Sequence, residues 1–255
     1  MAATVRVNDA DIYYEVHGEG PAIVLVAGYT CDHTFWQGLL PNLAGQFKVI
    51  TFDNRGVGRT KDNGQALSIE GLAADTAALI KYLGLRQPLV VGQSIGGAIV
   101  QSLFSIFPEM CGPGVILNST QKFETVTIKA LESLLELRQA DVDFDLLIDV
   151  TLPWLSGSDW LAKPHNISDF RHALRTNPFP QSVADQKRQL DALKHFDARM
   201  TNKPRKEPTL VISAAEDRIA SLSEGRALAQ HLDARFAEIP GGHASPVERA
   251  EKSQR

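Results

Sequence analysis

The stretch that most constrains the fold is residues 88–97, with the sequence Pro-Leu-Val-Val-Gly-Gln-Ser-Ile-Gly-Gly. The apolar residues 89–91 predict a buried strand, and residues 97–107 predict a helix that follows it at once. Ser94 stands at the apex of the tight turn between them, and Gly92 and Gly96 leave room for the neighbouring chain. This geometry raises the hydroxyl above the sheet and directs N–H groups of the helix start at whatever it attacks. We interpret Ser94 as a nucleophile, against the alternative of a chance Gly-x-Ser-x-Gly in a turn.

Composition excludes several classes of protein. The apolar fraction of 44% and the charged fraction of 22% are those of an ordinary globular chain, and 255 residues allow one large α/β domain with an insertion. A net charge of −4 gives no reason to expect nucleic acid or an anionic membrane as a partner. No apolar run is long enough to span a bilayer, and residues 1–7 lack the apolar region of a secretory signal.

The two cysteines, Cys31 and Cys111, suggest neither a metal site nor a disulfide framework. A reduced cytoplasmic setting is the simplest expectation for such a chain.

Strands and helices alternate on both sides of the serine turn. The expected strands are residues 4–7 and 11–16 as a hairpin, then 22–27, 47–52, 89–91, 114–118, 209–213 and 235–239. The expected helices lie around residues 36–43, at 68–82 with Ser68 as N-cap, at 97–107 and at 222–232. This order predicts an α/β fold with a mostly parallel sheet covered by helices on both faces.

The alternation stops between residues 119 and 206. No buried strand is convincing there, whereas residues 128–138, 167–175 and 184–196 have the pattern of amphipathic helices. We therefore expect an α/β core formed by residues 1–118 and 207–255, with residues 119–206 inserted in it as a helical cap.

A serine nucleophile needs a base, and the base needs an acid that orients it. Asp217 lies in the loop after the strand 209–213, and His243 follows the strand 235–239. Either residue alone would be interpreted as a surface loop residue. Together, however, serine, acid and histidine each follow a strand, and they occur in that order along the chain. Glu216 is adjacent to Asp217, so the residues themselves leave two candidates for the acid. His33, just beyond the Gly28-Tyr29 loop, is another histidine of interest.

Acyl chemistry also needs two N–H donors for the developing oxyanion. One is expected from the backbone of Ile95, the residue after the nucleophile. The other is expected from the loop after the strand 22–27, at Tyr29.

Four blocks of sequence resemble the α/β-hydrolase superfamily in its lidded, single-domain serine hydrolase branch. They are Gly28-Tyr29, the loop of residues 53–60, the turn of residues 92–97, and Asp217 together with Gly242-His243. The resemblance implies a catalytic triad of Ser94, Asp217 and His243, and it favours Asp217 over Glu216 from the position of the family's acid. It implies no metal and no organic cofactor. Many relatives have His-Gly before the oxyanion donor, whereas Ala27 precedes Gly28 here.

Ser94 also narrows the chemistry. An aspartate at this position would suggest a dehalogenase or an epoxide hydrolase, whereas a serine favours acyl transfer through an acyl-enzyme. We expect a cytoplasmic serine esterase that acts on small or medium carboxylic esters. The resemblance extends to carboxylesterases, 3-oxoadipate enol-lactonases and pimeloyl-carrier-protein methyl-ester esterases. Carbon–carbon bond hydrolases and non-catalytic ligand receptors on the same fold are further alternatives.

The substrate pocket is expected between the core and the cap. Its candidate residues are Gly28, Gln93, Phe123, Leu152 and Trp154. The alternative for the apolar cap residues is that they form the cap's own core. The partner that we expect is a small-molecule ester. The second half of the cap is basic and contains Arg171 and Arg175, so docking of an acidic acyl carrier protein is a further hypothesis. The oligomeric state stays open.

Overall fold

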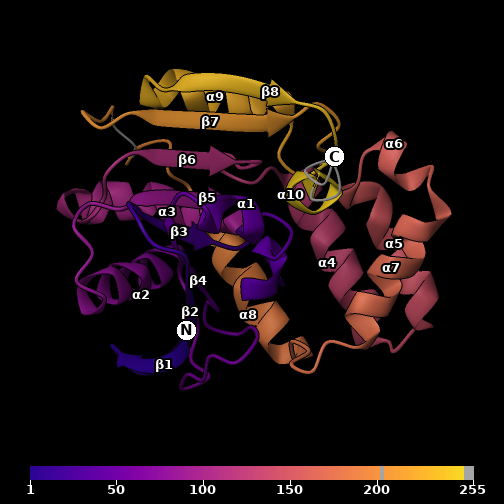
Figure 1. Ribbon diagram of the computed structural model, residues 1–255. Helices are drawn as coiled ribbons and strands as arrows, with labels where there is room; N and C mark the ends of the chain where they lie inside the picture. The colour runs from indigo at the N-terminus through magenta and orange to yellow at the C-terminus, as the bar shows by residue number, and fades with distance from the viewer. Residues whose placement is uncertain (202–203, 250–255) are drawn as a thin grey trace.

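The computed structural model describes residues 1–201 and 204–249. Within these residues one eight-stranded sheet has the order β1-β2-β4-β3-β5-β6-β7-β8 (Figure 1). β2 pairs antiparallel with β1 and with β4, and the remaining neighbours are parallel. The strands are β1 (Ala2–Val7), β2 (Ala10–His17), β3 (Ala22–Val26), β4 (Lys48–Phe52), β5 (Leu89–Gln93), β6 (Gly114–Leu117), β7 (Thr209–Ala214) and β8 (Arg235–Ile239). The expected mostly parallel sheet is confirmed.

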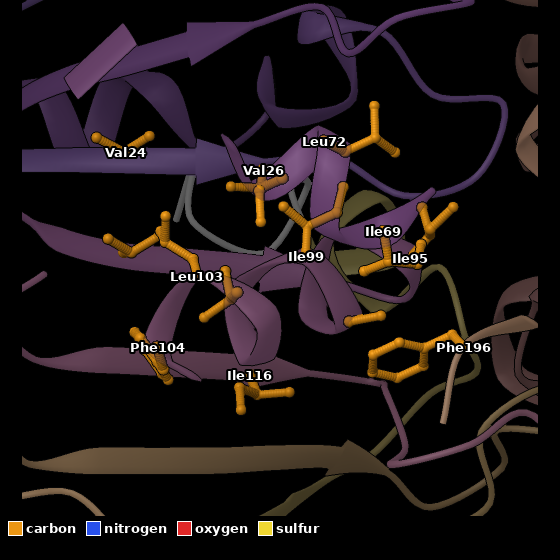
Figure 2. Close-up of a cluster of buried hydrophobic side chains, with 14 of the residues drawn as sticks. Val24, Val26, Ile69, Leu72, Ile95, Ile99, Leu103, Phe104, Ile116 and Phe196 are labelled. Atoms are coloured by element: carbon orange, nitrogen blue, oxygen red, sulfur yellow. The ribbon is translucent and has the colours of Figure 1, made fainter. Parts of the chain in front are cut away.

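Both faces of the sheet are buried, as alternate residues of β3 show. Ile23 and Leu25 belong to a cluster with Trp36, next to η1 (His33–Trp36) and α1 (Leu40–Ala44). Val24 and Val26 face the opposite cluster, which is formed with α2 (Ile69–Tyr82), α3 (Ile95–Ile106) and α9 (Leu222–Leu232). Figure 2 shows this larger cluster between the sheet and α2 and α3, with Phe196 at its edge. The short elements η2 (Pro108–Met110) and α10 (Ser245–Arg249) complete the core.

One helix expected from the sequence is divided in two. The apolar residues 36–43 were expected on a single helix, but η1 ends at Trp36 and α1 begins at Leu40. Asp32 caps η1 by accepting a hydrogen bond from the N–H of Thr34, and Pro41 occupies the first turn of α1. A proline is favourable at a helix start and disrupts a helix interior, so it separates the two segments.

Among the described residues, five helices lie between β6 and β7, and we call this segment the insertion. They are α4 (Thr125–Gln139), α5 (Phe144–Leu155), α6 (Ser158–Leu161), α7 (Pro164–Arg175) and α8 (Val183–His195). The arrowheads of β6 and β7 point towards α4, α5 and α7, so these helices lie beyond the carboxyl ends of the parallel strands (Figure 1). The sequence predicted α4, α7 and α8 but not α5 and α6. Pro153 lies inside α5, at a position where a proline in a sequence usually indicates the end of a helix.

The end of α5 is hydrogen-bonded to two loops of the core. The Arg218 side chain, in the loop after β7, donates to the carbonyl of Pro153 at 2.7 Å. The N–H of Ala244, in the loop after β8, donates to the carbonyl of Leu155 at 2.8 Å. We call residues 153–158 the seam of the insertion.

In the part of the chain that the structure describes, no helix combines the length and the apolar character needed to cross a bilayer.

Candidate active site

Ser94 occupies a strained turn between β5 and α3. Its backbone has φ 57° and ψ −120°, a conformation that residues other than glycine rarely adopt. A Cβ atom at Gly92 would lie 2.1 Å from the carbonyl oxygen of Gly96, and one at Gly96 would lie 2.2 Å from that of Val26. The turn therefore requires glycine on both sides of the serine. The hydroxyl of Ser119 donates to the Ser94 carbonyl at 2.8 Å and helps to hold this backbone.

His243 and Asp217 meet at the carboxyl ends of β7 and β8. The Nδ1 atom of His243 lies 2.8 and 3.0 Å from the two carboxylate oxygens of Asp217. The backbone N–H groups of Ile219 and Ala220 also donate to Asp217 Oδ1, at 2.8 and 2.9 Å. Hydrogen bonds to the charged form stabilise a buried carboxylate. A carboxylate at Nδ1 selects the tautomer that leaves Nε2 available as a base.

Ser94 and His243 line the same cavity, but no hydrogen bond joins their side chains among the described residues. Hydrogen bonds between a nucleophile and its base are often long without substrate and tighten when substrate binds.

Glu216, the competing acid, has a different partner. Its Oε2 atom accepts from the backbone N–H and the hydroxyl of Ser158, at 2.9 and 2.5 Å. These two hydrogen bonds lower the pKa of Glu216 below its ordinary value. Glu216 thus joins the loop after β7 to the seam, and its neighbour Asp217 contacts the histidine.

Asn118 is a site residue that the sequence analysis missed. It directly follows β6, is fully buried, and has φ 47°. Its Nδ2 atom donates to the His243 carbonyl and to the Ser245 hydroxyl, both at 2.8 Å, and its Oδ1 atom accepts from the Ala214 N–H at 2.9 Å. Gln93 also donates to the His243 carbonyl, at 3.0 Å. The sequence signal that could have identified Asn118 is its position, because it is a polar residue that directly follows the apolar residues of β6.

If Ser94 and His243 act together in catalysis, Asn118→Ala should lower kcat of that reaction by about 10- to 100-fold with a smaller change in KM. The reason is that the loop containing His243 loses the hydrogen bonds that fix its position. Unfolding free energy should fall by about 1–3 kcal/mol, since the carbonyl and N–H groups lose buried partners. Steady-state kinetics and thermal unfolding measure the two effects. Asn166→Ala is the matched control, because Asn166 is equally buried and donates to the Trp160 carbonyl at 3.0 Å inside the insertion. An equal loss of kcat in both variants would contradict a positioning role for Asn118.

The two expected oxyanion donors lie on segments that adjoin the serine. A Cβ atom at Gly28 would lie 3.4 Å from the Ser94 Cβ and 2.2 Å from the Gln93 side chain, so this loop packs directly on the turn. Within residues 1–201 and 204–249, the backbone N–H groups of Tyr29 and Ile95 have no acceptor. The next residue, Thr30, has φ 64° and donates its N–H to the Gln189 side chain of α8 at 3.1 Å. The insertion therefore helps to fix the backbone of the Tyr29 loop.

A cavity of ≈ 440 Å³ lies between the core and the insertion. Ser94, His243, Gln93 and the side chain of Trp154 line it, and most of its wall is apolar. This volume is within the usual range for small-molecule sites, about 300–1,000 Å³.

Three of the five expected pocket residues do not line this cavity. Leu152 packs with Ile148 and Trp160 in a separate core of the insertion, and Phe123 belongs to the main core. Gly28 has no side chain and lies against Gln93. The expectation fails for Leu152 because apolar residues of the insertion also form its own interior, and for Phe123 because its side chain packs into the main core.

His33 belongs to a different cluster, which it forms with Asp53 of the loop of residues 53–60. Its Nδ1 atom and its backbone N–H each lie 2.7 Å from Asp53 Oδ1, and the N–H of Arg59 donates to Asp53 Oδ2 at 2.7 Å. Burial lowers the pKa of His33, but the hydrogen bond and the charge of Asp53 outweigh it, so the pKa is raised. Asp32 completes a group with the geometry of metal ligands, although its Oδ1 already accepts from the N–H and hydroxyl of Thr34. These bonds indicate that the cluster shapes the two loops.

Comparisons with known proteins agree with this architecture. A sequence model described as "alpha/beta hydrolase fold" matches residues 21–250. The chain is 28% identical to "Putative carbamate hydrolase RutD" of Azorhizobium caulinodans over 239 residues, which cover 93% of this chain and 89% of that protein. It is 27% identical to pyrrolizixenacetamide deacetylase of Xenorhabdus hominickii over 255 residues, which cover 97% of this chain and 93% of that protein.

Among solved structures, the enol-lactonase from Burkholderia xenovorans LB400 superimposes with a TM-score of 0.84 at 24% identity, covering 98% of this chain and 96% of that one. A likeness at this identity establishes a shared fold.

Proposed function

Because the chain belongs to the alpha/beta hydrolase fold family, we propose that it is a serine hydrolase that cleaves small or medium carboxylic esters through an acyl-enzyme. Hydrolysis is the general activity that the family and the names of its relatives support. The observation that carries the proposal is one cavity lined by Ser94 and by His243, with Asp217 paired to the histidine.

The proposed reaction uses only groups of this chain and water. Ser94 Oγ attacks the ester carbonyl while His243 Nε2 takes its proton, and Asp217 stabilises the imidazolium. The N–H groups of Tyr29 and Ile95 stabilise the oxyanion. When the intermediate collapses, the carbon–oxygen bond to the alcohol breaks and His243 returns the proton to the alcohol. His243 then removes a proton from water as the water attacks the acyl-enzyme. When this second intermediate collapses, the bond between the acyl carbon and Ser94 Oγ breaks, His243 returns the proton to Ser94, and the acid is released.

An enol-lactone is an alternative substrate for the same residues, because its ring opening also forms an acyl-enzyme. The fold shared with an enol-lactonase is the observation that favours it. Carrier-bound methyl esters have less support. Arg171 pairs with Asp149, and Arg175 pairs with Asp145 at 2.8 Å, so both cations expected at a docking surface already have carboxylate partners on α5. We therefore propose a free small-molecule ester as substrate.

Turnover of p-nitrophenyl esters of graded acyl length tests the proposal. We expect hydrolysis of short and medium chains, with a decline when the acyl group exceeds the cavity. An organophosphonate should inactivate the protein with one adduct on Ser94, detected by mass spectrometry of the peptide. Absence of both turnover and labelling would overturn the esterase proposal and favour a ligand receptor on the same fold.

A further inference from the structure

The wall of the cavity contains a polar cluster formed by Tyr29, Arg138 and Gln186. These residues come from the loop after β3, from α4 and from α8, so the core and the insertion both contribute to it. The reaction proposed above uses none of these three side chains. The rest of the wall near the insertion is apolar, with Leu134, Trp154 and Ile219 among its residues.

Arg138 has no anionic partner in the described part of the chain. Its guanidinium donates to the side-chain oxygen of Gln186 and to the backbone carbonyl of Gln181, and both acceptors are neutral. The arginines of α7 and α8, by contrast, pair with carboxylates, as Arg188 does with Asp62 at 2.9 Å. A cation held in a cavity wall by neutral acceptors retains its affinity for an anion.

The hydroxyl of Tyr29 is a second polar group in the same part of the wall. It is buried, and among the described residues no group meets it at full hydrogen-bond geometry, although the Gln186 side chain lies close enough to influence it. Burial raises the pKa of Tyr29, and the neighbouring Gln186 side chain and the charge of Arg138 oppose this rise in part. The hydroxyl is therefore a neutral donor close to the guanidinium. A buried hydroxyl without a partner is unfavourable, and an acceptor atom on a ligand would satisfy it.

Asp32 is the acidic side chain of the same wall. Its Oδ1 atom accepts from the N–H of Thr34 at 2.9 Å and from the Thr34 hydroxyl at 2.5 Å, where it caps η1. Its partner is Thr34, whereas the partners of Arg138 among the described residues are Gln186 and Gln181. The charge of Arg138 is therefore not neutralised by a contact within the cavity.

We propose that Arg138, assisted by the Tyr29 hydroxyl, binds a carboxylate on the substrate, so that the preferred substrates are esters or lactones that also contain a free carboxylate. The inference rests on the proposed esterase function and names the substrate class of that site. The ester carbonyl lies at Ser94, the carboxylate lies at Arg138, and the apolar wall accommodates the chain that connects them. Arg138 thereby determines specificity without taking part in the reaction.

The experiment compares matched substrates that differ only in charge. Monomethyl succinate, glutarate and adipate have a carboxylate on the acyl side, and in their partners a primary carboxamide replaces it. The acetate ester of 6-hydroxyhexanoate places the carboxylate on the alcohol side instead. We expect the protein to prefer one of the anionic series over its neutral partner. Arg138→Gln should reduce that preference in kcat/KM by about 10- to 100-fold while the neutral esters change by less than about threefold.

Two further variants separate binding from folding. Arg138→Lys keeps the charge but loses the paired geometry, so it should restore part of the preference. Arg175→Gln removes an exposed arginine of the insertion outside the cavity wall, and it should leave the preference unchanged. Equal losses on charged and neutral esters in Arg138→Gln would assign Arg138 a structural role between α4 and α8 and overturn the inference, while the esterase function would stand.

A binding measurement keeps the two proposals distinguishable. Succinate, glutarate and adipate are titrated calorimetrically into the unmodified protein and into Arg138→Gln. Binding that is lost in the variant supports the anion site even if every ester is inert, in which case the esterase proposal alone fails. Ester turnover without a charge preference, together with no dicarboxylate binding, overturns the anion site alone.

Discussion

Ser94→Ala is expected to lower kcat for ester hydrolysis by about 10⁴- to 10⁶-fold, because the reaction loses the atom that forms the acyl-enzyme. The variant should remain folded, since the turn depends on Gly92, Gly96 and the Ser119 hydrogen bond, and the Ser94 hydroxyl makes no hydrogen bond within the described residues. Stopped-flow kinetics with the best p-nitrophenyl ester measures the loss. Ser102→Ala is the control, because it removes a hydroxyl from a buried residue of α3, the helix that follows Ser94, away from the cavity.

Ser94→Gly separates strain from chemistry. It should be as inactive as Ser94→Ala, but glycine adopts φ 57° and ψ −120° without the strain of about 1–3 kcal/mol that other residues incur. After subtracting the larger entropy of the unfolded glycine chain, about 0.5–1 kcal/mol, a net stabilisation of about 0–2.5 kcal/mol remains, so we expect a melting temperature up to about 10 °C above that of Ser94→Ala. Residual activity within tenfold of the parent in either variant would contradict the role of Ser94. A lower melting temperature for Ser94→Gly would contradict the strain.

Asp217→Asn is expected to lower kcat by about 10⁴-fold, whereas Glu216→Gln should change it by less than about tenfold. An asparagine offers no charge to the imidazolium and can select the wrong tautomer of His243, whose Nδ1 lies 2.8 Å from the carboxylate. Glu216 accepts hydrogen bonds from Ser158 instead. The glutamine of the Glu216→Gln variant should therefore weaken mainly the hydrogen bonds that join the seam to the loop after β7.

The two variants lie at neighbouring positions, and each replaces a carboxylate with an amide. Each is therefore the control for the other. The measurement is kcat and KM for a single ester, with circular dichroism to verify folding. If Glu216→Gln lost activity as strongly as Asp217→Asn, the assignment of the acid would be wrong.

The sequence predicts much of this fold because its signals are local. The strand of residues 22–27 is apolar at every position, which is the pattern of a strand buried on both faces, and the structure places β3 in the middle of the sheet. Ser68 caps α2 as expected, by accepting from the N–H of Gly71. The turn around Ser94 can be predicted for the same reason. Any turn of this kind brings backbone atoms so close to positions 92 and 96 that only glycine fits there.

Tertiary information is what the sequence lacks. Nothing near Asn118 in the chain indicates that it bonds residues 243 and 245, which lie more than a hundred positions away. Arg138 follows the pattern of a solvated helix face, and only the packing of α4 on α8 places it in the cavity wall. Leu152 and Trp154 are two apolar residues of one helix, and their spacing alone does not tell which of them faces the insertion's interior and which faces the cavity.

The seam has a consequence for how a ligand enters. Residues 153–158 are bonded to the loop that contains Asp217, through Arg218 and Glu216, and to the loop that contains His243, through Ala244. Moving the seam away from the core would break these hydrogen bonds and displace the loops that contain Asp217 and His243. The seam is therefore the part of the insertion that has to stay in place. A route into the cavity that leaves the positions of Asp217 and His243 unchanged must therefore avoid the seam.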